Sequence, residues 1–155
     1  MKWIVSCLII LSCGSTAFSQ KWAIETNVSL NYSGLSQSVR PQFIYKDVSI
    51  SLGPKVQYNR SAGFNKSAIG LSFDTDYQLD GASGFFVQYD FISSKINNIT
   101  TNIQEAYAGL MIQKEVKTVW LTKVRMGIGG YVESTSKYTL KGYHYCTNLS
   151  VSYQF

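Results

Sequence analysis

The residues of this chain that could carry out catalysis lie near its C-terminal end. The single histidine, His144, precedes Cys146 by two residues, and a hairpin of the last two predicted strands would set Glu133 across from it. A carboxylate that orients an imidazole is part of the arrangement that activates a nucleophile. No nucleophile with a recognisable motif accompanies the pair, and the proximity of Cys and His alone is a weak signal. We therefore expect a plain hydrogen bond between Glu133 and His144.

Other chemistry has little support in the sequence. The chain contains no metal-ligand cluster and no nucleotide-binding glycine motif, so we expect neither a metal nor a cofactor. Gly127, Gly129 and Gly130 fall within a strand pattern, where glycine relieves crowding or permits a bend. The basic excess is modest, with a formal net charge of +5, and no nucleic-acid partner is expected.

The segment that holds His144 is a strand with two different faces. Side chains of a strand point alternately to opposite sides. One face carries Tyr143, Tyr145, Thr147, Leu149, Val151, Tyr153 and Phe155. The other face carries His144, Cys146, Asn148, Ser150, Ser152 and Gln154. An apolar face, a small polar face and a final aromatic residue are typical of the closing strand of a transmembrane β-barrel.

Seven earlier runs show similar alternation, which predicts eight strands and an all-β chain. The runs span 22–32, 39–45, 48–58, 68–79, 85–92, 105–113, 119–133 and 143–155. Pro41 and Pro54 are local faults, because proline cannot donate to the ladder. The two faces of the sixth run are nearly equal in polarity, so its register is unresolved.

The predicted connections alternate in length. The longer ones follow the odd strands, at 33–38, 59–67, 93–102 and 134–142, whereas those after the even strands are short, as at Lys46-Asp47 and Asp80-Gly81. Membrane barrels have short turns on the periplasmic side and longer loops outside. The pattern therefore predicts an N-terminus on the periplasmic side.

Charged residues provide a sharper test of this interpretation. Outside the sixth run, each charge after residue 19 falls in a connection, at the N-terminal end of the barrel or on an inward face. A lipid-facing Lys or Arg near the bilayer midplane costs about 2 to 4 kcal/mol. The alternative, a water-soluble barrel of the lipocalin kind, would have an apolar interior and a charged exterior.

Aromatic residues cluster near both ends of the strands, as in the two interfacial girdles of membrane barrels. The periplasmic set is Trp22, Tyr45, Tyr77, Phe85, Trp120, Tyr153 and Phe155. The outer set is Tyr32, Tyr58, Phe91 and Tyr143. A general preference of aromatic residues for strands is the simpler alternative.

The beginning of the chain predicts export. Met1-Lys2, an apolar run from Trp3 to Leu11 and Ala17-Phe18-Ser19 together resemble a secretory signal peptide over residues 1–19. A lipoprotein that begins at Cys13 is the alternative. Residues 20–155 then form one barrel domain, in which Cys146 is the single cysteine and no intramolecular disulfide is possible.

With these features the chain resembles the small eight-stranded outer-membrane barrels of the OmpA/OmpX type. It also resembles, more loosely, the outer membrane β-barrel domain proteins of Bacteroidota. The resemblance covers residues 20–155 and includes Tyr153-Gln154-Phe155, which looks like the signal read by the barrel assembly machinery. It implies the outer membrane of a Gram-negative bacterium, with outer-membrane lipids, lipopolysaccharide and other outer-membrane proteins as partners. It implies little about activity, because this architecture hosts many roles.

A polar network is expected inside the barrel. Its predicted charged members are Glu25, Arg40, Lys55, Asp74, Asp76, Asp90, Lys123, Arg125, Glu133 and His144. Buried charges must be paired, and an eight-stranded barrel is just wide enough for side chains to fill. We expect Asp74 to lie opposite Asp90, with Lys55 or Arg125 between them. A narrow water-filled path for protons or ions is the alternative to a packed interior.

The predicted outer loops carry basic residues and no acidic ones. These residues are Arg60, Lys66, Lys95, Lys137 and Lys141. They could attract lipopolysaccharide phosphates, although a solvated loop face with a chance bias of charge is the simpler explanation.

The sequence thus predicts a non-enzymatic integral outer-membrane protein with a structural or accessory role and no wide pore. An accessory subunit of a larger secretion or assembly complex is the first alternative. A lipid A-modifying barrel enzyme is the second.

Overall fold

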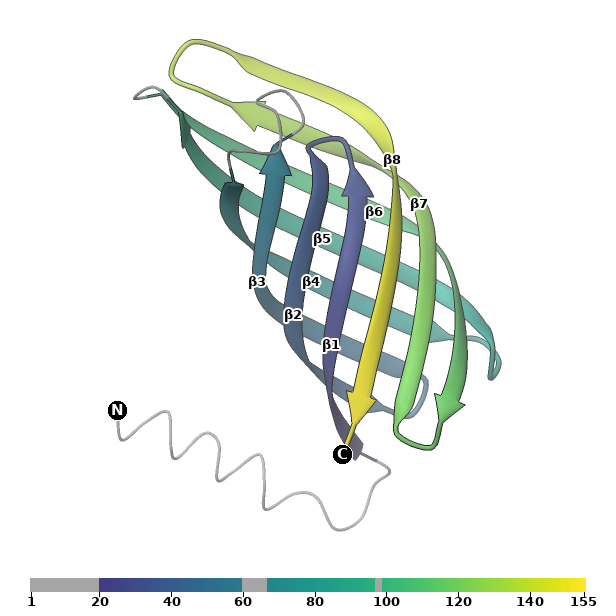
Figure 1. Cartoon of the computed structure of the whole chain (residues 1–155). Helices are drawn as coiled ribbons and strands as arrows, with labels where there is room; N and C mark the ends of the chain where they lie inside the picture. Colours follow the sequence, from purple (N-terminus) through teal and green to yellow (C-terminus); the bar gives the residue numbers. More distant parts are fainter. Residues whose placement is uncertain (1–19, 60–66, 97–98) are drawn as a thin grey trace.

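The computed structural model describes residues 20–59, 67–96 and 99–155, which form one closed barrel of eight antiparallel strands (Figure 1). The strands are β1 (Gln20–Asn31), β2 (Gly34–Tyr45), β3 (Val48–Asn59), β4 (Ser67–Gln78), β5 (Ser83–Ile96), β6 (Ile99–Lys117), β7 (Trp120–Ser134) and β8 (Thr139–Gln154). Each strand pairs with its neighbour in the chain, and β8 pairs with β1. The predicted fold class is confirmed.

The predicted signal peptide lies outside the described residues. Within the part of the chain that the structure describes, no helix is long and apolar enough to cross a membrane.

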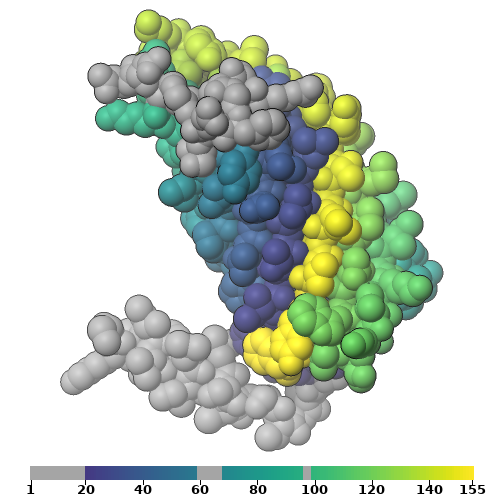
Figure 2. Space-filling model, in the orientation of Figure 1, coloured from purple at the N-terminus to yellow at the C-terminus, as the bar shows by residue number. Residues whose placement is uncertain are grey.

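Pairing of β1 with β8 closes the barrel. Their register runs from Ala23 opposite Gln154 to Leu30 opposite Thr147. Figure 2 shows the two strands side by side along this seam. Because every strand has a partner on both sides, the barrel leaves none of its described strands as a free sheet edge along its middle.

The alternation read from the sequence separates an inner face from an outer face. In β1, Ala23, Glu25 and Asn27 are buried, whereas Trp22, Ile24 and the other intervening residues are exposed. The same alternation runs through the other strands, with charged and amide side chains inside and apolar ones outside. The lipocalin-like alternative is therefore wrong, because charge and apolar surface lie on the opposite sides from those it requires.

Short turns join the strands at the end of the barrel where β1 begins and β8 ends (Figure 1). They comprise residues 46–47, 79–82 and 118–119. At the other end, which we call the outer end, the predicted loops 33–38, 93–102 and 134–142 are too long, and the predicted loop 59–67 lies almost wholly outside the described residues. A two-residue turn, Tyr32-Ser33, joins β1 to β2, and four residues, 135–138, join β7 to β8.

The loops are shorter because the strands continue beyond the apolar alternation that marked them in the sequence. Once outside the apolar band, a pair of strands can keep its backbone ladder with polar side chains on both faces. Ser93 opposite Asn102 and Ser134 opposite Thr139 are examples. Strands β5 to β8 have 14 to 19 residues against 12 for β1 to β4, and they project farther at the outer end (Figure 1).

The unresolved sixth strand is the longest, and its inner face explains the ambiguity. Ile103, Tyr107 and Met111 point inward together with Glu105, so polarity alone could not separate its two faces. Gly127 and Gly129 on β7 lie beside this apolar part of the interior. A Cβ on Gly127 would approach the backbone oxygen of Ala108 to 2.5 Å and Phe86 Cζ to 2.8 Å. One on Gly129 would clash with the backbone oxygen of Ala106 and approach Tyr107 Cδ1 to 2.6 Å. The expectation that glycine relieves crowding is confirmed at these two positions.

The two prolines mark a local fault, as expected. Strands β2 and β3 pair from Gly34 to Ser38 and again from Gln42 to Tyr45, and the intervening residues are not paired across the two strands. Pro41 and Pro54 lie in this interval between β2 and β3, while each stays paired with its other neighbour, Pro41 with Ile24 and Pro54 with Leu71. The register is the same on both sides of the interval, so the inward residues stay inward.

Candidate functional site

Within residues 20–59, 67–96 and 99–155, the inner wall of the barrel carries nine buried charged residues, which makes it the main candidate for function. They are Glu25, Arg40, Lys55, Asp74, Asp76, Asp90, Glu105, Lys123 and Arg125. Strict alternation places them there, because each occupies an inward position of its strand. Water is scarce in such a space, so the charges must find partners among themselves.

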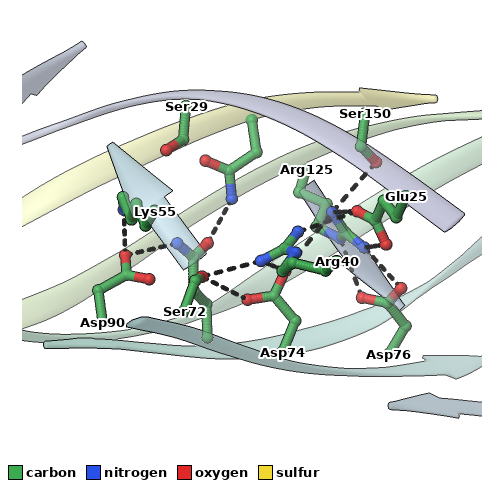
Figure 3. Close-up of polar contacts among 12 residues, drawn as sticks. Glu25, Ser29, Arg40, Lys55, Ser72, Asp74, Asp76, Asp90, Arg125 and Ser150 are labelled. Carbon is green, nitrogen blue, oxygen red and sulfur yellow. Dashed lines mark hydrogen bonds and ion pairs between the residues drawn. The ribbon is translucent and has the colours of Figure 1, made fainter. Parts of the chain in front are cut away.

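Arg125 on β7 is the centre of the network (Figure 3). Its Nη1 lies 2.7 Å from Glu25 Oε1 on β1, and its Nη2 and Nε lie 2.7 and 2.9 Å from the two carboxylate oxygens of Asp76 on β4. The planar guanidinium thus bonds Asp76 in a two-pronged manner and Glu25 at the same time. Ser150 on β8 accepts a further hydrogen bond from Nη1 at 3.2 Å.

Two more cations extend this cluster. Arg40 on β2 lies 3.0 Å from Glu25 and 2.6 Å from Asp74, measured between its Nη2 and Nη1 atoms and the carboxylate oxygens. Lys123 Nζ lies 2.6 Å from Asp76 Oδ2. Three carboxylates and three cations therefore form a cluster that is neutral as a whole. The cluster joins β1, β2, β4 and β7, and Ser150 attaches β8 to it.

A second ion pair lies toward the outer end. Lys55 Nζ contacts Asp90 Oδ2 at 2.5 Å, and Gln88 Nε2 donates to the same oxygen at 2.6 Å. Asn148 Nδ2 donates in turn to Gln88 Oε1, also at 2.6 Å. This chain of contacts links β3, β5 and β8 across the interior, as Figure 3 shows for its charged members.

The expectation that Asp74 lies opposite Asp90 is wrong by two residues. Asp74 pairs with Gln88, and Asp90 pairs with Ser72. The strands β4 and β5 are joined by residues 79–82, and the length of that turn sets the register. Each carboxylate has its own principal cation, Arg40 for Asp74 and Lys55 for Asp90, in place of one shared between them.

Sequence reasoning missed Glu105, because the register of its strand was unresolved. The carboxylate accepts hydrogen bonds from Asn31 Nδ2 at 2.5 Å, from Ser33 N at 3.3 Å and from Ser33 Oγ. It thus holds the β1–β2 turn against the far wall of the barrel. The distribution of charge along the sequence contained the missing signal. A carboxylate in the middle of a predicted membrane strand must face inward, and this requirement shows which face of β6 is the inner one.

Aromatic rings at the outer end surround the same turn. Tyr32 stacks on Tyr131 with ring centroids 3.5 Å apart, and it meets the His144 ring in a T-shaped arrangement with centroids 5.8 Å apart. Tyr107 Oη accepts a long hydrogen bond of 3.5 Å from Tyr32 N. Tyr32 was predicted to belong to the outer aromatic girdle, but it turns inward because the two-residue turn bends over the opening.

The predicted Glu133–His144 contact does not form. Gly129 lies opposite His144, and Glu133 lies opposite Leu140, because the hairpin loop is four residues long where nine were expected. Glu133 Oε1 accepts a hydrogen bond of 3.1 Å from Tyr138 Oη, which raises the pKa of that hydroxyl. The ring of His144 contacts the carbonyl oxygen of Tyr145 through Nδ1 at 2.7 Å.

A cavity of about 570 Å³ opens at the end that carries the short turns. Ser49, Asp76 and Lys123 line it and also belong to the ion-pair network, while Met111 and Leu121 form an apolar part of its wall. The network therefore lies at the inner side of this cavity. No group of three or more His, Cys, Asp or Glu suited to a metal ion occurs among residues 20–59, 67–96 and 99–155.

The predicted loop cations have different positions. Arg60 and Lys66 lie outside the described residues. Lys137 is exposed in the β7–β8 loop. Lys95 and Lys141 are exposed on strands, near the outer ends of β5 and β8, and not in loops as predicted. Charges on the outward face of the described strands are thus confined to strand ends.

Comparison with known proteins agrees with this architecture. No protein-family model matches the sequence, and no curated protein matches it significantly. Among solved structures, a major outer membrane protein from Thermus thermophilus has a TM-score of 0.56 at 12% identity, over 88% of this chain and 100% of that one. The N-terminal β-barrel domain of Pseudomonas aeruginosa OprF has a TM-score of 0.54 at 14% identity, over 87% and 97%. The chain therefore has the fold of the outer-membrane β-barrels.

Proposed function

We propose that this chain is an integral protein of the bacterial outer membrane with a structural or accessory role in the envelope, and that its filled interior does not form a wide pore. The observation that carries the proposal is the inverted distribution of charge. Among the described residues, nine charged side chains are buried inside, whereas the outer wall is apolar between its two ends. Such a surface is stable in a bilayer and would aggregate in water. The two solved outer-membrane barrels support the location.

Several contacts support a filled interior. Arg125 bridges β7 to β1 and β4, Arg40 bridges β2 to β1 and β4, and Lys55 bridges β3 to β5. Apart from the contact of Arg40 with Glu25 on the adjacent strand, these bridges join strands that are not neighbours in the sheet, so the side chains occupy the space that a solute would need. At the outer end the Tyr32-Ser33 turn is held across the opening by Glu105.

We also propose that the barrel has no catalytic activity. The one histidine, His144, is four residues out of register with Glu133, the carboxylate expected to orient it. Cys146, two residues along β8, is buried in a cluster with Phe86 and Tyr107, and no basic side chain is bonded to it among the described residues. Lipid A analysis of cells that carry His144→Ala tests this part, since an altered lipid A would contradict it.

Solute passage tests the proposed closed interior. Purified protein is refolded into phosphatidylcholine vesicles, and the folded fraction is measured by its heat-sensitive mobility in gel electrophoresis. We expect the wild type to leave the vesicles impermeable to small sugars in a swelling assay. Arg40→Ala/Arg125→Ala, in which the central cluster is removed, should increase permeability in the fraction that still folds. Free passage of sugars through the wild type would contradict a filled interior, and failure to insert would contradict a membrane barrel.

A further inference from the structure

The outward face of β8 changes character in an ordered way toward the outer end. Alternate residues along it are Leu149, Thr147, Tyr145, Tyr143 and Lys141. Apart from the small polar Thr147, the order is therefore aliphatic, aromatic and cationic, with Lys141 about 7 Å beyond Tyr143 along the strand. Tyr143 and Tyr145 are 93% and 63% exposed. This is the order of surroundings that a lipid offers from its acyl chain to its headgroup.

On the neighbouring strand β7, the residue opposite Tyr143 has no side chain. Gly130 on β7 lies opposite Tyr143, and a Cβ placed on it would meet no atom closer than 3.5 Å. Ile128, which is 77% exposed, lies opposite Tyr145. The outward wall thus carries no side chain at Gly130, where the ring of Tyr143 lies 3.9 to 4.0 Å from the place that a Cβ would take, and the aliphatic side chain of Ile128 comes next on the same face.

Charge on this part of the surface has one sign among the described residues. Lys141 and Lys137 are exposed, and Lys95 lies on the outward face of β5 at the same end. The acidic residues of β5 to β8 in this half of the barrel are Asp90, Glu105 and Glu133; the first two are buried, and the half-buried Glu133 is hydrogen-bonded to Tyr138. Lys141 has no ion-pair partner among the residues that the structure describes.

We propose that Ile128, Gly130, Tyr143, Tyr145 and Lys141 form a binding site for a phosphate-bearing glycolipid of the outer leaflet. The phosphate contacts Lys141, the sugar ring packs on Tyr143 over Gly130, and an acyl chain follows Tyr145 and Ile128 toward the membrane centre. The site extends the proposed function and rests on it, because it requires that the barrel span an outer membrane with this end facing outward. It assigns the lipid contact to the lipid-facing wall of β7 and β8, away from the loop tips.

The test uses refolded full-length barrel in detergent and lipid A as the probe, with bound lipid counted by native mass spectrometry. Lys141→Gln should weaken lipid A binding about fivefold, the equivalent of about 1 kcal/mol for one surface cation. Tyr143→Ala should weaken it as well, and Lys141→Arg should retain it. The matched control is Lys117→Gln, which removes an exposed lysine near the end of β6 at the opposite end of the barrel. This control should bind like the wild type.

Two results would overturn the site. One is equal binding of lipid A by Lys141→Gln and the wild type. The other is equal binding of lipid A and its dephosphorylated form by the wild type, because the phosphate would then contribute nothing. Folding is scored separately by heat-sensitive gel mobility on the same samples. A folded barrel without selective binding contradicts only this site, whereas a barrel that fails to insert into membranes contradicts the proposed function itself.

Discussion

Arg125 and Glu25 meet inside the barrel although β8 separates their strands, with 2.7 Å between Nη1 and Oε1 and no exposed surface on either side chain. The contact ties β7 to β1 across the closing strand. It therefore stabilises the closed barrel at a place where backbone hydrogen bonds do not act directly.

Removal of the Arg125 guanidinium should be among the most destabilising single changes in this chain. Arg125→Ala leaves Glu25 with Arg40, and Asp76 with Lys123, as their remaining cations. Breaking a buried ion pair by deleting one partner costs about 3 to 5 kcal/mol. Urea unfolding from lipid vesicles, followed by tryptophan fluorescence, measures the loss. A loss no larger than that of the surface variant Lys117→Gln would contradict the central role of Arg125.

The Lys55–Asp90 pair allows a test of coupling between two named groups. Lys55→Met alone leaves the Asp90 carboxylate with Gln88 as its donor, and Asp90→Leu alone leaves a buried ammonium. Each single variant should destabilise the barrel, whereas Lys55→Met/Asp90→Leu should lose less than the sum of the two. We expect a coupling energy between about 0.5 and 3 kcal/mol from a double-mutant cycle. Additive losses would show that the two side chains do not stabilise each other.

Asp80 in the β4–β5 turn provides a prediction on pH. Its Oδ1 accepts hydrogen bonds from Ala82 N at 2.9 Å, Ser83 N at 2.5 Å and Ser83 Oγ at 2.9 Å, which lower the pKa of the carboxyl. A carboxyl whose pKa is lowered by folding stabilises the turn above its unfolded value of about 3.9, and this contribution is lost as pH falls through the folded value.

Carbon NMR of the side-chain carboxyl in detergent micelles measures the titration of Asp80. The midpoint should lie below that of the same residue in a short peptide. Ser83→Ala removes one of the three hydrogen bonds and should move the midpoint upward. A midpoint equal to the peptide value would mean that the turn does not form as described.

The two faces of the barrel were readable from sequence because alternation is a local property. Glu25, Arg40, Asp74 and Arg125 each occupy the polar phase of an alternating run, and a period of two assigns them inward without knowledge of any other strand. The apolar outer wall and the burial of these charges could therefore be predicted from each strand by itself. Glu105 has Ile103 and Tyr107 as its inward companions on β6, and polarity alone therefore could not place it.

The partners of each charge could not be derived in the same way, because pairing depends on loop length. Each residue misjudged in a hairpin loop shifts the opposite strand, and a shift of even number preserves the faces while changing every neighbour. His144 thus lies on the inward face as predicted, but the residue opposite it is Gly129 and not Glu133. The residue opposite Asp90 is likewise Ser72 and not Asp74. Contacts between strands that are not neighbours, such as Arg125 with Glu25, also depend on the stagger of the closed barrel, which no local pattern reports.

Adjacent glycines on β7 offer the most closely matched test of the packed interior. Gly129 faces inward, where a Cβ would clash with the backbone oxygen of Ala106 and come within 2.6 Å of Tyr107 Cδ1, and Gly130 faces outward, with no atom closer than 3.5 Å. Both lie between β6 and β8 and differ in sequence by one position. Gly129→Ala should therefore cost about 1 to 3 kcal/mol through overpacking, whereas Gly130→Ala should change the free energy of unfolding little. Urea unfolding of both variants under identical conditions measures the difference. Equal losses would mean that the inner wall at β6 and β7 is loosely packed, and they would remove the physical reason for glycine at position 129.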